Sequence, residues 1–236
     1  MSTVLFWFRS DLRLHDQPAL RAALTSGATH LLPVACLPAS DETTPWGFAR
    51  VGSHRRAFTA AALRGLHQQT SALGNPLLIC QAPPATALPQ LAQAVGATTV
   101  VCEDIAAPYE QAEVAALRAA GLQVRTVWHS SLLHPADMPW PASDLPGVFT
   151  SFRQKVERAG ITPAAPLPAP ARLLPPPQVP APVLQAVGAE QGAASIQQPT
   201  PPQGTDARSS FPYGTPACDG CEAAALAHLA QYLARK

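Results

Sequence analysis

A short apolar run near the N-terminus leads directly into a charged turn and then into the start of a helix. Residues Thr3–Phe8 are mostly aromatic or β-branched, which indicates a strand that is buried on both faces of a parallel sheet. Asp16 can cap the following helix, whose first turn contains Pro18. Open α/β sheets usually carry their sites at the carboxyl ends of such strands. Four charged or titratable residues lie there, in a loop that could otherwise be a salt-bridged surface turn: Arg9, Asp11, Arg13 and His15.

Apolar runs and amphipathic segments alternate along the first half of the chain. Strands are predicted at Thr3–Phe8, Leu31–Leu37, Leu77–Cys80, Thr99–Glu103 and Gln123–Val127, and helices at Gln17–Ser26, Ser53–Leu73, Ala85–Val95 and Tyr109–Ala120. The long helix carries an apolar stripe that should face a sheet, formed by Phe58, Ala61, Ala62, Leu66 and Leu73. This alternation predicts an α/β fold: a Rossmann-like five-stranded parallel sheet with right-handed crossovers and helices on both faces.

The composition changes after Gly160. Twelve of the 27 prolines lie between Ile161 and Gly204, and proline both fixes φ and removes an N–H donor. The segment should therefore run as an extended linker over the surface, or as a disordered tail. A terminal helix is predicted at Glu222–Ala234, with one apolar side that we expect to be exposed: Ala225, Leu226, Leu229 and Leu233.

Charge and hydropathy exclude several classes of protein. The net charge is +1 and only 13% of residues are charged, so the chain lacks the basic surface of an autonomous nucleic-acid binder. It has neither an apolar run long enough to span a bilayer nor a signal-type N-terminus, and we expect it to be cytoplasmic, with no membrane partner. The five cysteines are scattered, and Cys36, Cys80 and Cys102 fall in or beside buried strands. A disulfide framework is not expected.

Familiar ligand motifs are largely missing. The chain has no G-x-G-x-x-G, and Gly52 is followed by Ser53-His54 rather than by the Lys of a P-loop, which disfavours a dinucleotide dehydrogenase. Cys218 and Cys221 form a C-x-x-C pair without the second pair that a structural zinc site needs, so we predict no metal site. Basic residues cluster at the start of the long helix, where they could hold an anion or could simply lie on the surface: Arg50, His54, Arg55 and Arg56.

The loop after the first strand resembles the opening of the photolyase/cryptochrome family, which has the form Arg-x-Asp-Leu-Arg-x-x-Asp-Asn/Gln-x-Ala-Leu. The matching residues are Arg9, Asp11, Leu12, Arg13, Asp16, Gln17, Ala19 and Leu20. Collinear segments extend the resemblance over roughly the first 160 residues: Arg56 to Leu78, Val100 to Gly121, and Val148 to Glu157. The run from Val124 to Leu133 and the Phe-Thr-x-Phe-Arg segment are similar to the DASH-type cryptochromes.

This resemblance implies a division of the chain and a light-dependent role. Members of the family are about twice this length, and their C-terminal helical domain binds FAD and splits pyrimidine dimers in DNA by electron transfer. We therefore expect a truncated protein that lacks the FAD site and is inactive alone. Its parts would be an antenna domain (residues 1–133), a connecting segment with a short helix (134–160), a Pro-rich linker (161–216) and the start of the helical domain (217–236).

The resemblance also implies site residues and partners. Glu103 and Asp104 would bind an antenna chromophore, a folate such as methenyltetrahydrofolate or a flavin, and we add Arg50 and His54 to this site. The next residues depart from the family's polar pattern, because they are Ala106-Ala107-Pro108-Tyr109.

In the intact family Arg9, Asp11, Arg13 and Asp16 would brace the loop that faces the second domain, and DNA would be the partner. For this chain we expect self-association or a separate FAD-binding domain. The alternative is a stand-alone Rossmann-like module that binds a nucleotide or chromophore without catalysis.

Overall fold

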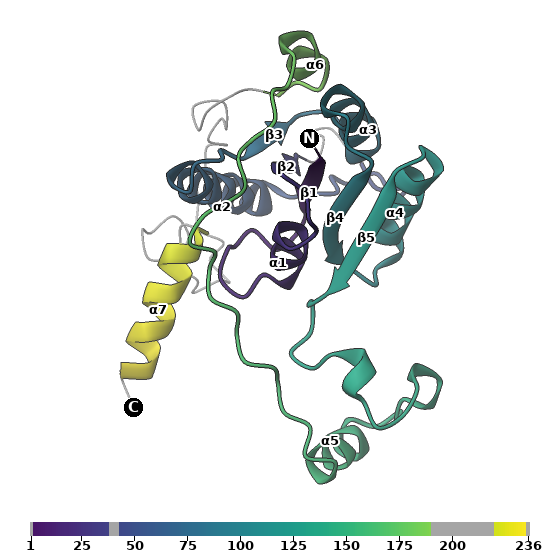
Figure 1. Ribbon diagram of the computed structural model, residues 1–236. Coiled ribbons are helices and arrows are strands. Elements are labelled where there is room, and N and C mark those ends of the chain that lie inside the picture. Colours follow the sequence, from purple (N-terminus) through teal and green to yellow (C-terminus); the bar gives the residue numbers. More distant parts are fainter. Residues whose placement is uncertain (1, 38–42, 190–219, 235–236) are drawn as a thin grey trace.

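Five parallel strands form a single sheet at the centre of the chain (Figure 1). The computed structural model describes residues 2–37, 43–189 and 220–234. The strands are β1 (Thr3–Phe8), β2 (His30–Cys36), β3 (Leu78–Cys80), β4 (Thr99–Asp104) and β5 (Gln123–Trp128). They lie in the order β3-β2-β1-β4-β5, so the chain adds two strands on one side of β1 and then crosses to the other side. The predicted five-stranded Rossmann-like sheet is confirmed.

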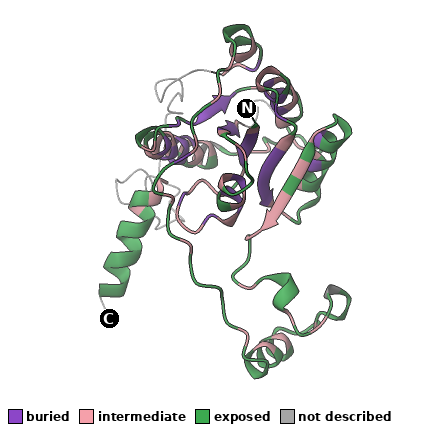
Figure 2. Cartoon of the chain, in the orientation of Figure 1, coloured by how far each residue is buried: buried purple, intermediate pink, exposed green. Residues whose placement is uncertain are grey.

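The central strand, β1, contributes to two apolar layers. Val4, Phe6 and Phe8 belong to one core cluster, and Leu5 and Trp7 belong to the other. All five residues are buried, and the strand is coloured as buried over most of its length in Figure 2. A strand that is covered on both faces needs an apolar residue at every position, which explains why the run shows no polar alternation.

Helices cover both faces of the sheet. The helices α1 (Pro18–Leu24) and α2 (Ser53–Ala72) supply residues to the cluster of Phe6, whereas α3 (Pro84–Val95) and α4 (Pro108–Ala119) supply residues to the cluster of Trp7. Every strand and helix that the sequence predicts in this part of the chain is present, with bounds that differ by at most two residues.

The buried face of α2 differs from the predicted stripe. Ala60, Leu63 and Leu66 pack into the core, while the Phe58 side chain is 55% exposed. Phe58 lies instead beside Gly220, where an added Cβ atom would come within 2.8 Å of the Phe58 carbonyl oxygen. The prediction that Phe58 faces the sheet was therefore wrong, because an apolar residue on a helix flank can pack against a distant segment of the chain.

Part of the Pro-rich segment is integrated into the domain. Its first stretch is extended, as predicted, and the Pro175 carbonyl accepts a hydrogen bond of 3.1 Å from the Leu31 amide at the start of β2. Leu173 and Val187 are buried, one in each core cluster. A short helix that the sequence did not predict, α6 (Ala181–Ala186), follows. A disordered tail is thus excluded for residues 161–189, while residues 190–216 lie outside the described part of the chain.

Two helices carry exposed apolar side chains. In α5 (Phe149–Arg158), which lies apart from the sheet (Figure 1), the Phe149 side chain is 74% exposed. The terminal helix α7 (Glu222–Ala234) has the predicted bounds and exposes Leu226, Leu229 and Leu233, as expected. Among the described residues, no helix combines the length and the apolar character that a membrane span requires. The four-part division of the chain stays a prediction.

The Asn75 side chain tests whether the Pro-rich segment belongs to the folded unit. It is fully buried, and its Nδ2 donates to the Leu31 carbonyl at 2.7 Å and to the Leu174 carbonyl at 2.8 Å. Asn75→Ala leaves both acceptors without this donor, so we expect the free energy of unfolding to fall by about 1–3 kcal/mol in urea titrations. Gln68→Ala, at an exposed position of α2, is the control. Equal stability of the two variants would show that these two hydrogen bonds add nothing to the stability of the fold.

Candidate functional site

The strand order creates a crevice at the carboxyl ends of β1 and β4. The chain leaves β1 toward β2 on one side, and β4 pairs with β1 on the other side. Ligands of open α/β sheets bind at such switch points, because the loops that follow the two strands diverge there. The charged loop after β1 begins at this point.

Arg9 anchors that loop to β4 and α4. Its side chain is only 3% exposed and forms an ion pair of 2.7 Å with Glu113. It also donates hydrogen bonds to the carbonyls of Glu110, at 2.8 Å, and Glu103, at 3.3 Å. The guanidinium lies 4.5 Å from the ring centroid of Trp7. The alternative of a salt-bridged surface turn therefore fails for Arg9, which is a buried structural cation.

The rest of the loop is held by contacts to distant segments. Asp16 adopts a φ of 50°, and its carboxylate accepts a hydrogen bond of 3.1 Å from the Leu167 amide. It does not cap α1: Gln17 is the N-cap residue, and no side chain caps this helix. The prediction of an Asp16 cap was wrong because Asp16 turns toward the Pro-rich segment.

Asp11, Glu103 and His129 converge behind this loop. The Asp11 Oδ2 lies 2.8 Å from the His129 Nε2, and one donor atom of each of the three side chains lies within 4.8 Å of the others. Burial raises the pKa of Glu103, although the charge of His129 opposes this shift. Burial acts to lower the pKa of His129, but the hydrogen bond and charge of Asp11 outweigh it, so that this pKa is raised.

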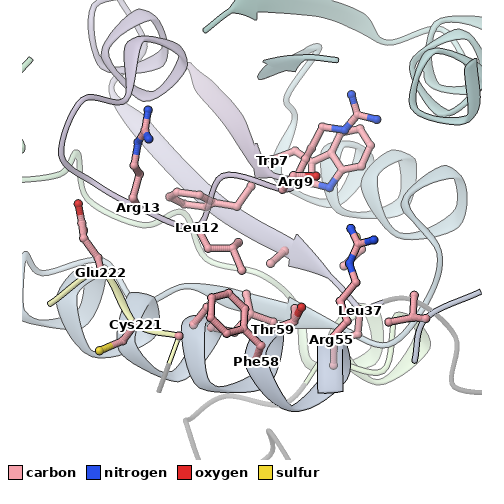
Figure 3. A pocket seen from close by; sticks show the side chains of 18 of the residues that line it. Trp7, Arg9, Leu12, Arg13, Leu37, Arg55, Phe58, Thr59, Cys221 and Glu222 are labelled. Carbon is pink, nitrogen blue, oxygen red and sulfur yellow. The ribbon is translucent and has the colours of Figure 1, made fainter. Parts of the chain in front are cut away.

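The terminal helix closes one side of the crevice. The Glu222 carboxylate accepts hydrogen bonds from the backbone amides of Leu14, at 3.0 Å, and His15, at 2.8 Å. The segment that leads into α7 can approach α2 closely because residue 65 of α2 is a glycine. A Cβ atom added at Gly65 would come within 2.7 Å of the Cys221 Cβ. The first turn of α7 is thereby fixed to the loop after β1 (Figure 3).

These elements enclose a cleft with a volume of about 960 Å³. Its walls come from the carboxyl ends of β1 and β2, from α2, from the start of α4 and from α7 (Figure 3). Cationic and aromatic side chains share the lining. The Arg50 guanidinium lies 3.0 Å from the ring centroid of Tyr109, and Arg55 and Phe58 project from α2 into the same space. This lining can hold a planar anionic molecule.

Of the four residues that the sequence assigned to a chromophore site, Arg50 alone is among those that line the cleft. Glu103 is buried with Asp11 and His129, and Asp104 accepts a hydrogen bond of 3.0 Å from Gln111. His54 lies near the start of α2. Their ligand-binding role stays a prediction.

Other residues of the site were missed from the sequence. Tyr109 stands out in the sequence only as a departure from the family pattern, and His129 only as part of the run from Val124 to Leu133 that is similar to the DASH-type cryptochromes. The missed signal was positional: both residues follow strands that end at the same edge, Tyr109 at the start of α4 and His129 directly after β5. The sequence around Glu113 and Glu222 does not indicate a role for either residue, because their partners lie on distant segments.

The cysteines of the described residues are free thiols, as predicted. Cys36 and Cys80 are register partners on β2 and β3, and their mutual hydrogen bond and burial raise the pKa of Cys36. Burial raises the pKa of Cys102 to about 11. The C-x-x-C pair is not described as a whole, since Cys218 lies outside the described residues.

Because Arg9 is buried and fully engaged, we expect its removal to lower the stability of the fold. Arg9→Ala removes an ion pair, two hydrogen bonds to carbonyls and the contact with Trp7, and leaves Glu113 without its cation. We expect the free energy of unfolding to fall by about 2–4 kcal/mol in urea titrations. Arg125→Ala, on the exposed surface of β5, should change it by less than about 0.5 kcal/mol. Similar values for the two variants would contradict the structural role of Arg9.

Comparisons with known proteins agree with the fold and with the loop after β1. The family model for DNA photolyase matches residues 4–171. Cryptochrome DASH of a Synechocystis strain is 36% identical over 184 residues, which cover 75% of this chain and 37% of that protein. The chain thus spans little more than a third of the length of this relative.

Solved structures show the same relationship. A Synechocystis cryptochrome matches with a TM-score of 0.70 and 34% identity, over 76% of this chain and 38% of the other. A class III photolyase from Agrobacterium tumefaciens matches with a TM-score of 0.61 and 28% identity, over 76% of this chain and 36% of the other. The chain belongs to the photolyase/cryptochrome family, and its α/β unit is an N-terminal photolyase domain of the kind found in cryptochrome DASH.

Proposed function

We propose that this chain is the light-harvesting domain of a DASH-type cryptochrome or photolyase. In this role it binds a planar chromophore in the cleft at the carboxyl edge of the sheet and passes excitation energy to a flavin. The observation that carries the proposal is the cleft itself, which combines a switch-point position with aromatic and cationic walls. The cytoplasmic location expected from the sequence is part of the same proposal.

The chemistry of the lining favours a folate over a neutral pigment. Methenyltetrahydrofolate has a flat ring system and an anionic glutamate tail. In the proposed arrangement the ring stacks against Tyr109 or Phe58, while Arg50 and Arg55 pair with the tail. A flavin nucleotide presents a similar combination of ring and anion and is the second ligand to test.

In the family, the flavin chemistry and the binding of DNA are properties of a helical FAD-binding domain. This chain takes part in both through such a domain. The chain has a net charge of +1, which gives little electrostatic attraction for DNA. We therefore assign the recognition and splitting of pyrimidine dimers to the helical domain, carried by the same protein or by a partner. The α/β domain supplies excitation energy and the surface on which that domain packs.

Titration of the full chain with methenyltetrahydrofolate, followed by its fluorescence, tests the proposal. We expect saturable binding with one molecule per chain. Arg50→Ala and Tyr109→Ala should each weaken binding about tenfold, which corresponds to about 1.4 kcal/mol for loss of a cation or a stacking surface. Arg125→Ala and Tyr232→Ala are the matched controls, since neither residue lines the cleft. Binding that all four variants leave unchanged, or no binding of either folate or flavin, would refute the role of the cleft.

The exposed side of α7 bears on the expected partners. Leu229 is 52% and Leu233 is 58% exposed, and contiguous exposed apolar surface favours association. We expect concentration-dependent self-association in sedimentation experiments, and less of it for the double variant Leu229→Gln/Leu233→Gln. Leu132→Gln, which removes an exposed leucine elsewhere, is the control. A monomer at every concentration would leave a helical FAD-binding domain as the expected partner.

A further inference from the structure

Asp11, Glu103 and His129 come from the ends of three neighbouring strands and form a compact set of donor atoms. Asp11 follows β1, Glu103 lies in β4 and His129 follows β5. One oxygen of each carboxylate and one ring nitrogen of His129 lie within 4.8 Å of one another. We propose that these three side chains bind a divalent transition-metal ion, for which Zn²⁺ is the appropriate probe. This site is separate from the proposed chromophore cleft, whose lining includes none of the three residues.

The orientation of His129 favours a cation at Nε2. The Nδ1 atom lies 3.1 Å from the Val127 carbonyl oxygen, and a carbonyl can only accept, so Nδ1 carries a proton. In the neutral ring Nε2 then presents a lone pair, yet it lies 2.8 Å from the Asp11 carboxylate, which is also an acceptor. Two acceptors at this distance require a proton or a metal ion between them. A histidine whose second nitrogen donates to a carbonyl is the usual arrangement in metal sites.

Glu103 supplies an independent observation. Glu103 is 8% exposed, and its Oε2 atom is buried without a hydrogen-bond partner among the described residues. Burying an unpaired carboxylate oxygen is costly. The Arg9 hydrogen bond goes to the Glu103 backbone carbonyl and not to this oxygen, although the charge of Arg9 also acts on the Glu103 carboxylate. A metal ion that is shared with Asp11 and His129 would satisfy this oxygen.

The donor set and spacing suit a transition metal. The carboxylates are hard ligands and the imidazole is a borderline one, and it is the imidazole nitrogen that makes the set suit Zn²⁺ and its neighbours better than Ca²⁺, which takes oxygen ligands. A tetrahedral Zn²⁺ with bonds of about 2.0–2.1 Å holds its ligands about 3.4 Å apart. The Asp11 and His129 atoms would therefore have to separate by about 0.6 Å, which a side-chain rotation can provide. Water would take the fourth position.

Two guanidinium groups, those of Arg9 and Arg13, act on this cluster. The Arg13 Nε lies 3.2 Å from the Asp11 Oδ1, and the Arg13 side chain is 39% exposed. The Gln17 amide donates to the Asp11 Oδ2 at 3.1 Å and can release it. The two carboxylates thus bring two negative charges to a cluster in which Arg13 pairs with Asp11, while the Arg9 guanidinium pairs with Glu113. A bound metal would join the ends of β1, β4 and β5 at the switch point of the sheet.

Calorimetric titration of the chelator-treated full chain with ZnCl₂ tests the proposal. The Cys218→Ser/Cys221→Ser background removes the C-x-x-C pair as a competing site. We expect one equivalent of Zn²⁺ to bind, and the nitrogen NMR signals of the His129 ring to shift on binding. His129→Gln and Glu103→Gln should each weaken binding at least about tenfold. His134→Gln, at an exposed histidine of the following segment, should bind Zn²⁺ like the parent.

Glu103→Gln separates a metal site from a simple ion pair. It keeps the size of the side chain and leaves the Asp11–His129 contact in place, so its chelator-treated form should fold. Thermal unfolding with Zn²⁺ should show stabilisation of the parent and not of this variant, since a ligand stabilises the state that binds it. The proposal is overturned if the folded parent binds no Zn²⁺, or if binding and stabilisation survive both Glu103→Gln and His129→Gln.

Discussion

The buried guanidinium of Arg9 is the interaction on which the architecture of the site depends. β1 is covered on both faces, so the residue that follows it starts inside the protein rather than at the surface. A cation in this position is stable only if its donors are met by acceptors. One carbonyl of β4, one carbonyl of α4 and the carboxylate of Glu113 provide them. The same contacts bind β1, β4 and α4 together at the point where the strand order reverses, and so they fix the place from which the loop after β1 starts.

Most of the fold could be predicted from the sequence, because its signals are local. The continuous apolar run of β1, the strand and helix alternation and the apolar face of α7 depend on residues within one element. Membership of the photolyase family was also visible, since the loop from Arg9 to Leu20 keeps its residues at fixed spacing. These features need no knowledge of which distant segments meet.

The errors and omissions share a physical cause. Asp16 is placed correctly for a helix cap, yet its carboxylate binds the Leu167 amide from the Pro-rich segment. Phe58 fits an amphipathic stripe, yet it packs beside the chain entering α7. His129 becomes informative only when the strand order places it next to Asp11, 118 residues earlier. Local pattern cannot decide between two acceptable partners when one of them lies far along the chain.

The hydrogen bonds that complete the loop after β1 have a consequence for folding during synthesis. The Asp16 carboxylate accepts a hydrogen bond from an amide 151 residues further along the chain. The His15 amide donates to a carboxylate 207 residues further along. Contacts of such high sequence separation form late, because the chain between them must be ordered first. All five strands lie before residue 130, so the sheet can assemble on the nascent chain while later segments are still being made. The loop at its carboxyl edge is therefore the last part of the domain to reach its final form, after almost the whole chain has been made.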